Sequence, residues 1–89
     1  SDSEIASSME SLPHWIRSGD HIERTFVFQD FRQAFGWMAS VATAAEALNH
    51  HPDWSTVYKT VKVQLSTHDA GGITALDFKL AAEMDRLAG

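Results

Sequence analysis

The sequence of 89 residues contains no cysteine. This absence excludes a disulfide scaffold, a thiolate metal site and a cysteine nucleophile. It is compatible with a reducing intracellular compartment, so we expect a cytoplasmic protein, with the nucleus as the alternative location. Long hydrophobic runs are also lacking: no stretch approaches the roughly 20 apolar residues that span a bilayer, and none resembles a signal peptide.

Basic residues are scarce, because 7 Lys and Arg stand against 12 Asp and Glu and the formal net charge is −5. They form no cluster, which argues against nucleic acid as a direct partner. The length corresponds to a single domain, residues 1–89, whose modest core would gain from further burial between copies of the chain.

The N-terminal part of the sequence predicts a β-hairpin. Residues 21–28 alternate between apolar and polar side chains, except that Arg24 falls on the apolar face. Residues 15–17 predict a shorter strand, and residues 18–20 supply the turn. Ahead of this hairpin, three apolar residues could line one side of a short helix that ends before Pro13: Ile5, Met9 and Leu12.

Residues 31–48 carry the clearest helical pattern, with Asp30 as the N-cap and Pro52 as a barrier beyond the end. One apolar stripe is predicted to face the core: Phe31, Phe35, Met38, Val41, Ala42 and Ala45. The opposite side is small and uncharged: Gly36, Ser40, Thr43, Ala44 and Ala47. Such a side favours the close approach of another helix.

The C-terminal part predicts a second hairpin and a last helix. Residues 55–58 and 61–66 form the strands, with a turn at 59–60, and Thr74 caps the helix. Asp77 lies within the apolar stripe of that helix, so its carboxylate needs a partner in the core. We therefore predict an α+β fold, a four-stranded antiparallel sheet with helices packed on one face, in the order (α)ββαββα.

Three histidines are expected to converge. His50 and His51 follow the long helix, and His68 follows the fourth strand; a tight hairpin brings its two outer ends side by side. Glu46 and Asp77 stand nearby in this arrangement. A single histidine at a helix end is more often a capping residue, and we assign no role to His14 or His21.

A convergent set of imidazoles and carboxylates has two interpretations. It could bind zinc or iron, or it could carry out metal-free general acid–base catalysis. The spacing matches no standard metal motif, and adjacent histidines are awkward to aim at one ion, which favours acid–base catalysis. The residue pattern leaves both interpretations open.

The motif that runs from Glu46 to Trp54, EALNHHPDW, resembles the pterin-4a-carbinolamine dehydratase family. Further matches are Val57-Tyr58, the run from Leu65 to His68, Gly71, Thr74 and Asp77. The resemblance covers roughly residues 12–88 and leaves residues 1–11 poorly matched. It implies a dehydratase that removes water from 4a-hydroxytetrahydropterin to give quinonoid dihydropterin, in tetrahydrobiopterin recycling, with no metal and no other cofactor.

The resemblance also implies roles for individual residues. His50 and His68 handle the proton of the 4a-hydroxyl, and His51 binds and positions the pterin. The implied substrate-binding set is Glu46, His50, His51, Pro52, Trp54, Thr67, His68, Asp69, Ala70 and Asp77. It further implies a homodimer or homotetramer, through sheet edges and the long helix. The alternative function is a dimerising protein-interaction module or transcriptional coactivator that uses the uncharged helix face.

Overall fold

Three α-helices and four antiparallel strands follow one another as αββαββα in the computed structural model, which describes residues 1–89. The elements are α1 (Asp2–Met9), β1 (Ile16–Ser18), β2 (His21–Val27), α2 (Phe31–Leu48), β3 (Asp53–Val57), β4 (Thr60–Leu65), a 3-10 turn (His68–Ala70) and α3 (Ala75–Ala88). The predicted α+β fold class and element order are thereby confirmed.

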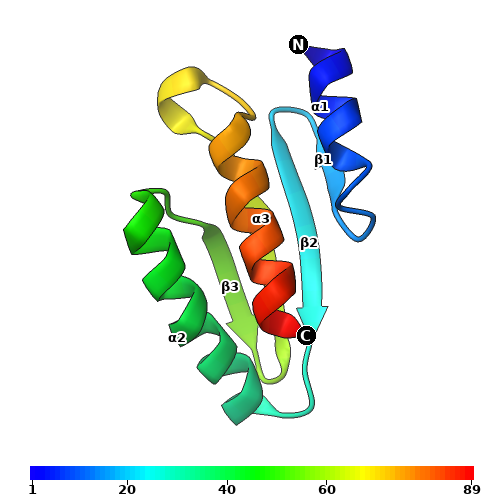
Figure 1. Ribbon diagram of the computed structural model, residues 1–89. Coiled ribbons are helices and arrows are strands. Elements are labelled where there is room, and N and C mark those ends of the chain that lie inside the picture. Colours follow the sequence, from blue (N-terminus) through cyan, green and yellow to red (C-terminus); the bar gives the residue numbers. More distant parts are fainter.

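The sheet has the strand order β1-β2-β4-β3, so β4 lies between two strands that precede it in the chain. Helix α2 carries the chain from β2 to β3 at the far edge, and β4 then returns beside β2, pairing Ile22 with Leu65 and Val27 with Thr60. Helices α2 and α3 lie side by side over one face of the sheet (Figure 1). The C-terminal end of α2 and the N-terminal end of α3 therefore meet at the same end of the molecule.

The core forms between the helices and the inward face of the two central strands. Period-two alternation buries Ile22 and Phe26 of β2 and three residues of β4, while α2 and α3 contribute one stripe each. Its aromatic centre is the pair of Phe26 and Trp37, whose ring centroids lie 4.4 Å apart. The indole Nε1 of Trp37 donates to the carbonyl oxygen of Met84 at 3.0 Å, which ties α2 to α3.

The buried stripe of α2 differs from the predicted one. The residues that face the core are Ala34, Trp37, Val41 and Ala45, whereas Phe31 and Phe35 are 49% and 58% exposed. Ala42 is also exposed and Met38 is half-buried. At 100° per residue the true stripe is rotated by roughly 60° from the prediction. The cause is Trp37, because its large indole buries more area and gains a hydrogen-bond partner on α3.

The small side of α2 borders an open groove. Ala44 and Ala47 line this groove beside Lys79, Ala82 and Glu83 of α3. The close approach of another helix, which these small residues lead us to expect, stays a prediction.

Arg24 interrupts the apolar alternation of β2 because it has a partner on α3. Its guanidinium Nη1 lies 2.6 Å from Oδ1 of Asp85 and its Cζ lies 4.1 Å from the ring centroid of Phe26. The indole of Trp15 donates to the same carboxylate oxygen at 2.9 Å. This half-buried cluster joins the first hairpin to the last helix.

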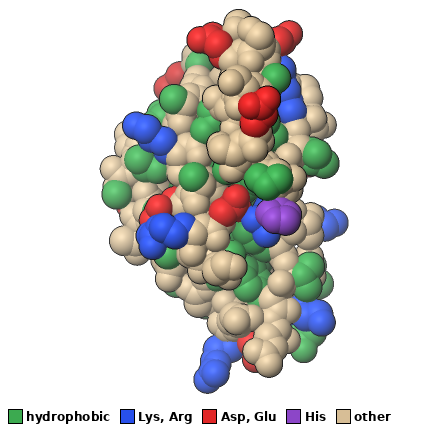
Figure 2. Space-filling view, turned by 45° about the vertical axis from the view of Figure 1, so that its right-hand side comes forward, with side chains coloured by type: hydrophobic (Ala, Val, Ile, Leu, Met, Phe, Trp, Pro, Cys, Tyr) green, Lys and Arg blue, Asp and Glu red, His purple; other side chains and the backbone are tan.

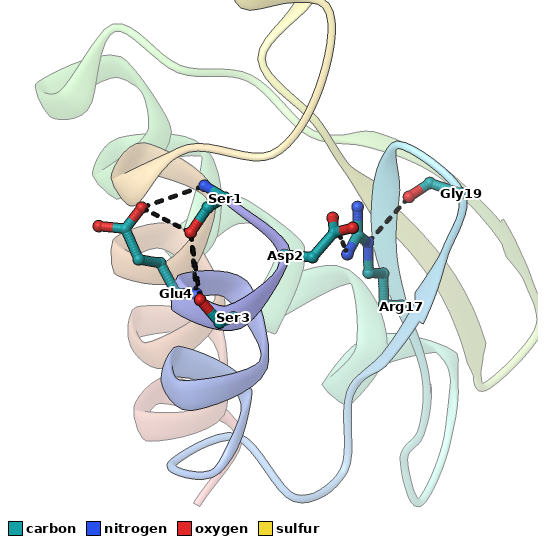
Figure 3. A network of polar contacts seen from close by, with 6 residues as sticks. All are labelled: Ser1, Asp2, Ser3, Glu4, Arg17 and Gly19. Carbon is teal, nitrogen blue, oxygen red and sulfur yellow. Dashed lines mark hydrogen bonds and ion pairs between the residues drawn. The ribbon is translucent and has the colours of Figure 1, made fainter.

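Helix α1 packs at the edge of the molecule beside the first hairpin (Figure 1). Ser1 and Glu4 form a capping box at its start, and Asp2 pairs with Arg17 of β1 at 2.9 Å (Figure 3). On the face of the molecule drawn in Figure 2, acidic, basic and apolar side chains are interspersed, and neither charge gathers into an extended patch.

No helix of the chain combines the length and the apolar character needed to cross a membrane.

The turn of the second hairpin lies one residue earlier than predicted. Val57 pairs with Thr60, so Tyr58 and Lys59 form the turn rather than Lys59 and Thr60. Tyr58 takes φ of 54°, in the left-handed region that only glycine adopts without cost. The strand β3 runs from Asp53 to Val57, so it begins two residues earlier than predicted and lies close to the preceding histidines.

Candidate functional site

The C-terminus of α2 places the two adjacent histidines. Asn49 takes the left-handed conformation with φ of 50°, and its N–H donates to the carbonyl of Glu46 at 3.1 Å. The N–H of His50 then donates to the carbonyl of Ala45 at 3.0 Å. These two bonds form a Schellman motif, which ends the helix and reverses the chain direction. The imidazoles are thus fixed by the helix end before Pro52 is reached.

His50 is buried against a carboxylate of α3. Its Nε2 lies 2.6 Å from Oδ1 of Asp77, and the two residues are 8% and 0% exposed. Asp77 is in the core, as its place in the apolar stripe predicts, and His50 is the partner that it needs. Asp77 also completes the capping box of α3, since its Oδ2 accepts from the backbone N–H of Thr74 at 2.8 Å.

This contact determines the tautomer of His50. A carboxylate accepts hydrogen bonds, so the Nε2 of His50 must carry the proton that lies between the two groups. In the neutral ring, Nδ1 is then unprotonated and free to accept a proton. Nδ1 has no hydrogen-bond partner in the protein and is not among the buried unpartnered atoms, so it is open to solvent. His50 therefore presents a basic nitrogen at the surface.

His51 repeats this arrangement in a more exposed place. Its Nε2 lies 2.7 Å from Oε1 of Glu46, one turn back on α2, with side chains 58% and 79% exposed. The carboxylate again holds the proton on Nε2 and leaves Nδ1 free. Because both groups are largely solvated, the pair contributes orientation more than stability.

His68 is carried by a short loop that is closed on itself. The backbone of Thr67 bonds with that of Gly72 in both directions, at 2.7 and 3.3 Å, and Gly71 takes φ of 69°. The side-chain hydroxyl of Thr67 donates to Oδ2 of Asp77 at 3.0 Å. The loop that bears His68 is therefore anchored to the same carboxylate that holds His50.

The three imidazoles line one open cavity of about 270 Å³ at the end of the molecule where α2 ends and α3 begins. Its other lining residues are Asn49, Ser66, Thr67, Asp69 and Leu76. A space of this size is close to the lower end of small-molecule sites.

The predicted site residues divide into three groups. The first group lines the cavity: His50, His51, Thr67, His68 and Asp69. The second group, Glu46 and Asp77, does not line the cavity but forms hydrogen bonds with two of its imidazoles. The remaining three, Pro52, Trp54 and Ala70, do not line it. Trp54 instead lies on the helix side of β3, with its ring centroid 6.1 Å from that of Trp37. Its contact with a ligand stays a prediction.

Three cavity residues were not singled out in the sequence as contacts. Ser66 and Leu76 could not be recognised from the sequence, because serine and leucine residues next to loops are common in proteins and do not indicate contact with a ligand. Asn49 could have been found, since asparagine is the residue other than glycine that most readily takes the left-handed cap position.

No group of His, Asp and Glu in the chain is arranged to hold a metal ion.

Comparison with known proteins agrees with this geometry. The family model described as "Pterin 4 alpha carbinolamine dehydratase" matches residues 1–87. A protein of Jannaschia sp. named "Putative pterin-4-alpha-carbinolamine dehydratase" is 54% identical over 84 residues, covering 94% of this chain and 86% of that protein. A protein of the same name from Bradyrhizobium diazoefficiens is 52% identical over 83 residues, covering 91% and 83%.

The fold leads to the same group. The crystal structure of a transcriptional coactivator/pterin dehydratase from Brucella melitensis superimposes with a TM-score of 0.97 at 42% sequence identity, covering 100% of this chain and 97% of that one. By the family match and the identity of these relatives, the chain belongs to the pterin-4a-carbinolamine dehydratase family, a family of hydro-lyases.

Proposed function

We propose that the chain removes water from 4a-hydroxytetrahydropterin to give quinonoid dihydropterin, the step that returns the pterin to tetrahydrobiopterin recycling. The observation that carries the proposal is the group of three imidazoles around one cavity, two of them held by carboxylates so that Nδ1 is free. Membership of the family supports the substrate class.

The reaction asks only for proton transfer. The N–H proton at N5 is removed, its electron pair forms the C4a=N5 double bond, and the bond from C4a to the hydroxyl oxygen breaks. The hydroxyl leaves as water after it receives a proton, so the atoms balance without oxidant or reductant. Imidazole suits both transfers near neutral pH, and a positioned acid or base contributes about 10²–10⁴-fold.

In this proposal His50 and His68 handle the proton of the 4a-hydroxyl: an imidazole nitrogen that is unprotonated at rest first accepts a proton, such as the one released from N5, and then delivers it to the departing hydroxyl. Nδ1 of His50 is the reacting atom, because Nε2 is occupied by Asp77. His51, fixed by Glu46, binds and positions the pterin ring from the exposed side of the cavity. Thr67 and Asp69 line the cavity, and in this proposal their backbone groups bond the polar pterin edge.

A dehydration assay with enzymatically generated 4a-hydroxytetrahydropterin tests the proposal. His50→Ala and His68→Ala should each lower kcat, and the double variant should approach the spontaneous rate, because neither imidazole is then present to transfer a proton to the hydroxyl. His51→Ala should raise KM more than it lowers kcat, since it removes binding shared by the ground state and the transition state.

His14→Ala is the matched control, because His14 is exposed and lies outside the cavity. It should keep wild-type kinetics. A His50/His68 double variant that melts like the wild type and keeps full activity would contradict the mechanism.

A second proposal concerns self-association through α2. The rings of Phe31 and Phe35 contact each other with centroids 5.9 Å apart and planes tilted by 37°, and both remain about half exposed, with Met38 and Ala42 on the same side. An exposed aromatic stripe on one helix is typical of an interface. We propose that it pairs with the same stripe of a second copy in a homodimer or homotetramer. A protein-interaction or coactivator role would use the small, uncharged side of α2, which is a different surface.

Light scattering at micromolar concentration measures the assembly. Phe35→Glu should lower the oligomer state, because the interface would then bury an unpaired charge. Arg32→Glu, on an exposed position of the same turn that lies outside the stripe, is the control and should leave the mass unchanged. A wild-type mass that equals the monomer would refute the proposal.

A further inference from the structure

Two threonines join the loop of His68 to the carboxylate behind His50. The hydroxyl oxygens of Thr67 and Thr74 lie 2.6 Å apart, and Oγ1 of Thr67 lies 3.0 Å from Oδ2 of Asp77. Oγ1 of Thr74 also accepts from the backbone N–H of Leu76 at 3.3 Å. These contacts go beyond what a helix cap requires, since the capping box uses only the hydroxyl of Thr74 and the carboxylate of Asp77, and not the hydroxyl of Thr67.

The direction of each hydrogen bond follows from the number of protons. A hydroxyl has one proton, and that of Thr67 must go to Asp77, because a carboxylate only accepts. Thr67 therefore accepts from Thr74, whose own proton points to Thr67 while its lone pair accepts from Leu76. Both hydroxyls are fully used, and the arrangement has one direction, from Thr74 through Thr67 to Asp77.

Asp77 is thereby kept in a single orientation. Its Oδ2 accepts from the Thr67 hydroxyl and the Thr74 N–H, which leaves Oδ1 for His50 alone. Both oxygens are occupied in the folded chain, so the carboxylate cannot rotate without losing bonds at both ends. The residue that precedes His68 in the chain is held at the same point.

We propose that Thr67 and Thr74 are positioning residues for the proton-transfer histidines, fixing the orientation of Asp77 against His50 and the separation of His50 from His68. This role rests on the proposed dehydratase function. Both hydroxyls are used by partners within the chain, so the threonines act through Asp77 on one histidine and through the loop backbone on the other.

Thr67→Val tests the role, because valine keeps the shape and the backbone bonds of Thr67 and removes only the hydroxyl. We expect kcat to fall about 10-fold with KM within about 2-fold, as a bond to a charged group is lost. Thr67→Ser should restore most of kcat. In the ¹⁵N spectrum of the histidine rings, the Nε2–H signals of His50 should shift and broaden in the valine variant, because Asp77 is then held by fewer bonds, while the ring keeps the Nε2–H tautomer.

Asp30→Ala controls for a purely structural effect. It removes the N-cap of α2, whose side chain accepts from Gln33 N–H at 2.8 Å, about 27 Å from the site by helix length. It should lower the melting temperature while kcat and the His50 ring signals stay as in the wild type. In the wild type itself, the hydroxyl protons of Thr67 and Thr74 should exchange slowly enough to give resolved proton resonances.

A Thr67→Val protein with wild-type kcat and unchanged His50 ring signals would overturn the positioning role. Hydroxyl protons that exchange at the rate of exposed threonines would overturn it without any variant. A wild-type chain without dehydratase activity would remove the proposed function, and the His50 ring signals and the hydroxyl exchange rates would still decide whether the threonine pair holds Asp77 against His50.

Discussion

Replacing Asp77 by asparagine changes the chemistry of the site while its shape is kept. The carboxylate accepts three bonds: from His50 at 2.6 Å, from Thr67 at 3.0 Å and from Thr74 N–H at 2.8 Å. Asparagine has a single acceptor oxygen and an NH₂ donor. Thr67 and Thr74 donate to the same position, so the amide oxygen takes that place and the NH₂ faces His50.

The Nε2 of His50 must then accept, which moves the ring proton to Nδ1, the nitrogen that is open to the cavity. The histidine loses its free basic nitrogen, and kcat should fall by about 10²–10⁴-fold, the usual contribution of a general acid or base. That corresponds to roughly 3–5 kcal/mol of transition-state free energy at 1.36 kcal/mol for each tenfold change. Pterin binding, through His51 and the loop, should change little.

The stability cost should be smaller. Bonds to a charged group become bonds to a neutral amide, so the free energy of unfolding should fall by about 1–3 kcal/mol. Asp77→Ala should cost about 3–5 kcal/mol, because the donors are left buried without a partner. Urea unfolding measures both variants, and ¹⁵N ring shifts report the tautomer directly.

Asp85→Asn provides the matched control. Asp85 is another carboxylate of α3 and receives Arg24 and the Trp15 indole, but it lies outside the cavity. It should lose stability and keep kcat. The reasoning fails if folded Asp77→Asn retains kcat within about 3-fold, or if its His50 ring stays protonated at Nε2.

Three further changes have defined outcomes. Asn49→Val should lower stability by about 1–2 kcal/mol, because a β-branched residue resists φ of 50°, whereas Asn49→Gly should stay close to wild type; thermal melts compare them. Tyr58→Gly should raise the urea midpoint, since the turn position has φ of 54° and the exposed ring packs little. The hydrogen bond to Arg86 lowers the pKa of Glu83, so its stabilisation is present at neutral pH and is lost as pH falls through that lowered pKa. Glu83→Gln should therefore melt below wild type near pH 7 and equal to it in acid; a difference that grows in acid would contradict this.

Local signals in the sequence were sufficient for the elements and for the convergence of the histidines. The cap at Asp30 and the end at Leu48 follow from residues within a few positions, and Asp77 is placed in the core by helical periodicity alone. The rotation of α2 was not predictable in this way, because two stripes with the same period compete. The choice depends on a contact 47 residues away, between Trp37 and Met84.

The same distinction applies within the site. The pairing of His51 with Glu46 is local, and the motif indicates it. The tautomer of His50 depends on its contact with the Asp77 carboxylate, 27 residues away, and the orientation of that carboxylate depends in turn on Thr67 and Thr74. Sequence patterns carry residue types and spacing, whereas proton positions follow only from the complete set of contacts.

The strand order has a consequence for how the chain folds. Because β4 lies between β2 and β3, the central pairing of Val27 with Thr60 must close a loop that contains all of α2. Such non-local pairing is slow, since chain entropy is lost before the contacts form. The β3–β4 hairpin closes through a turn of two residues and already brings the ends that bear His51 and His68 together. The residues of the site, from Glu46 to Asp77, thus belong to one continuous segment. This segment can fold early, before the N-terminal hairpin joins the sheet and completes the core.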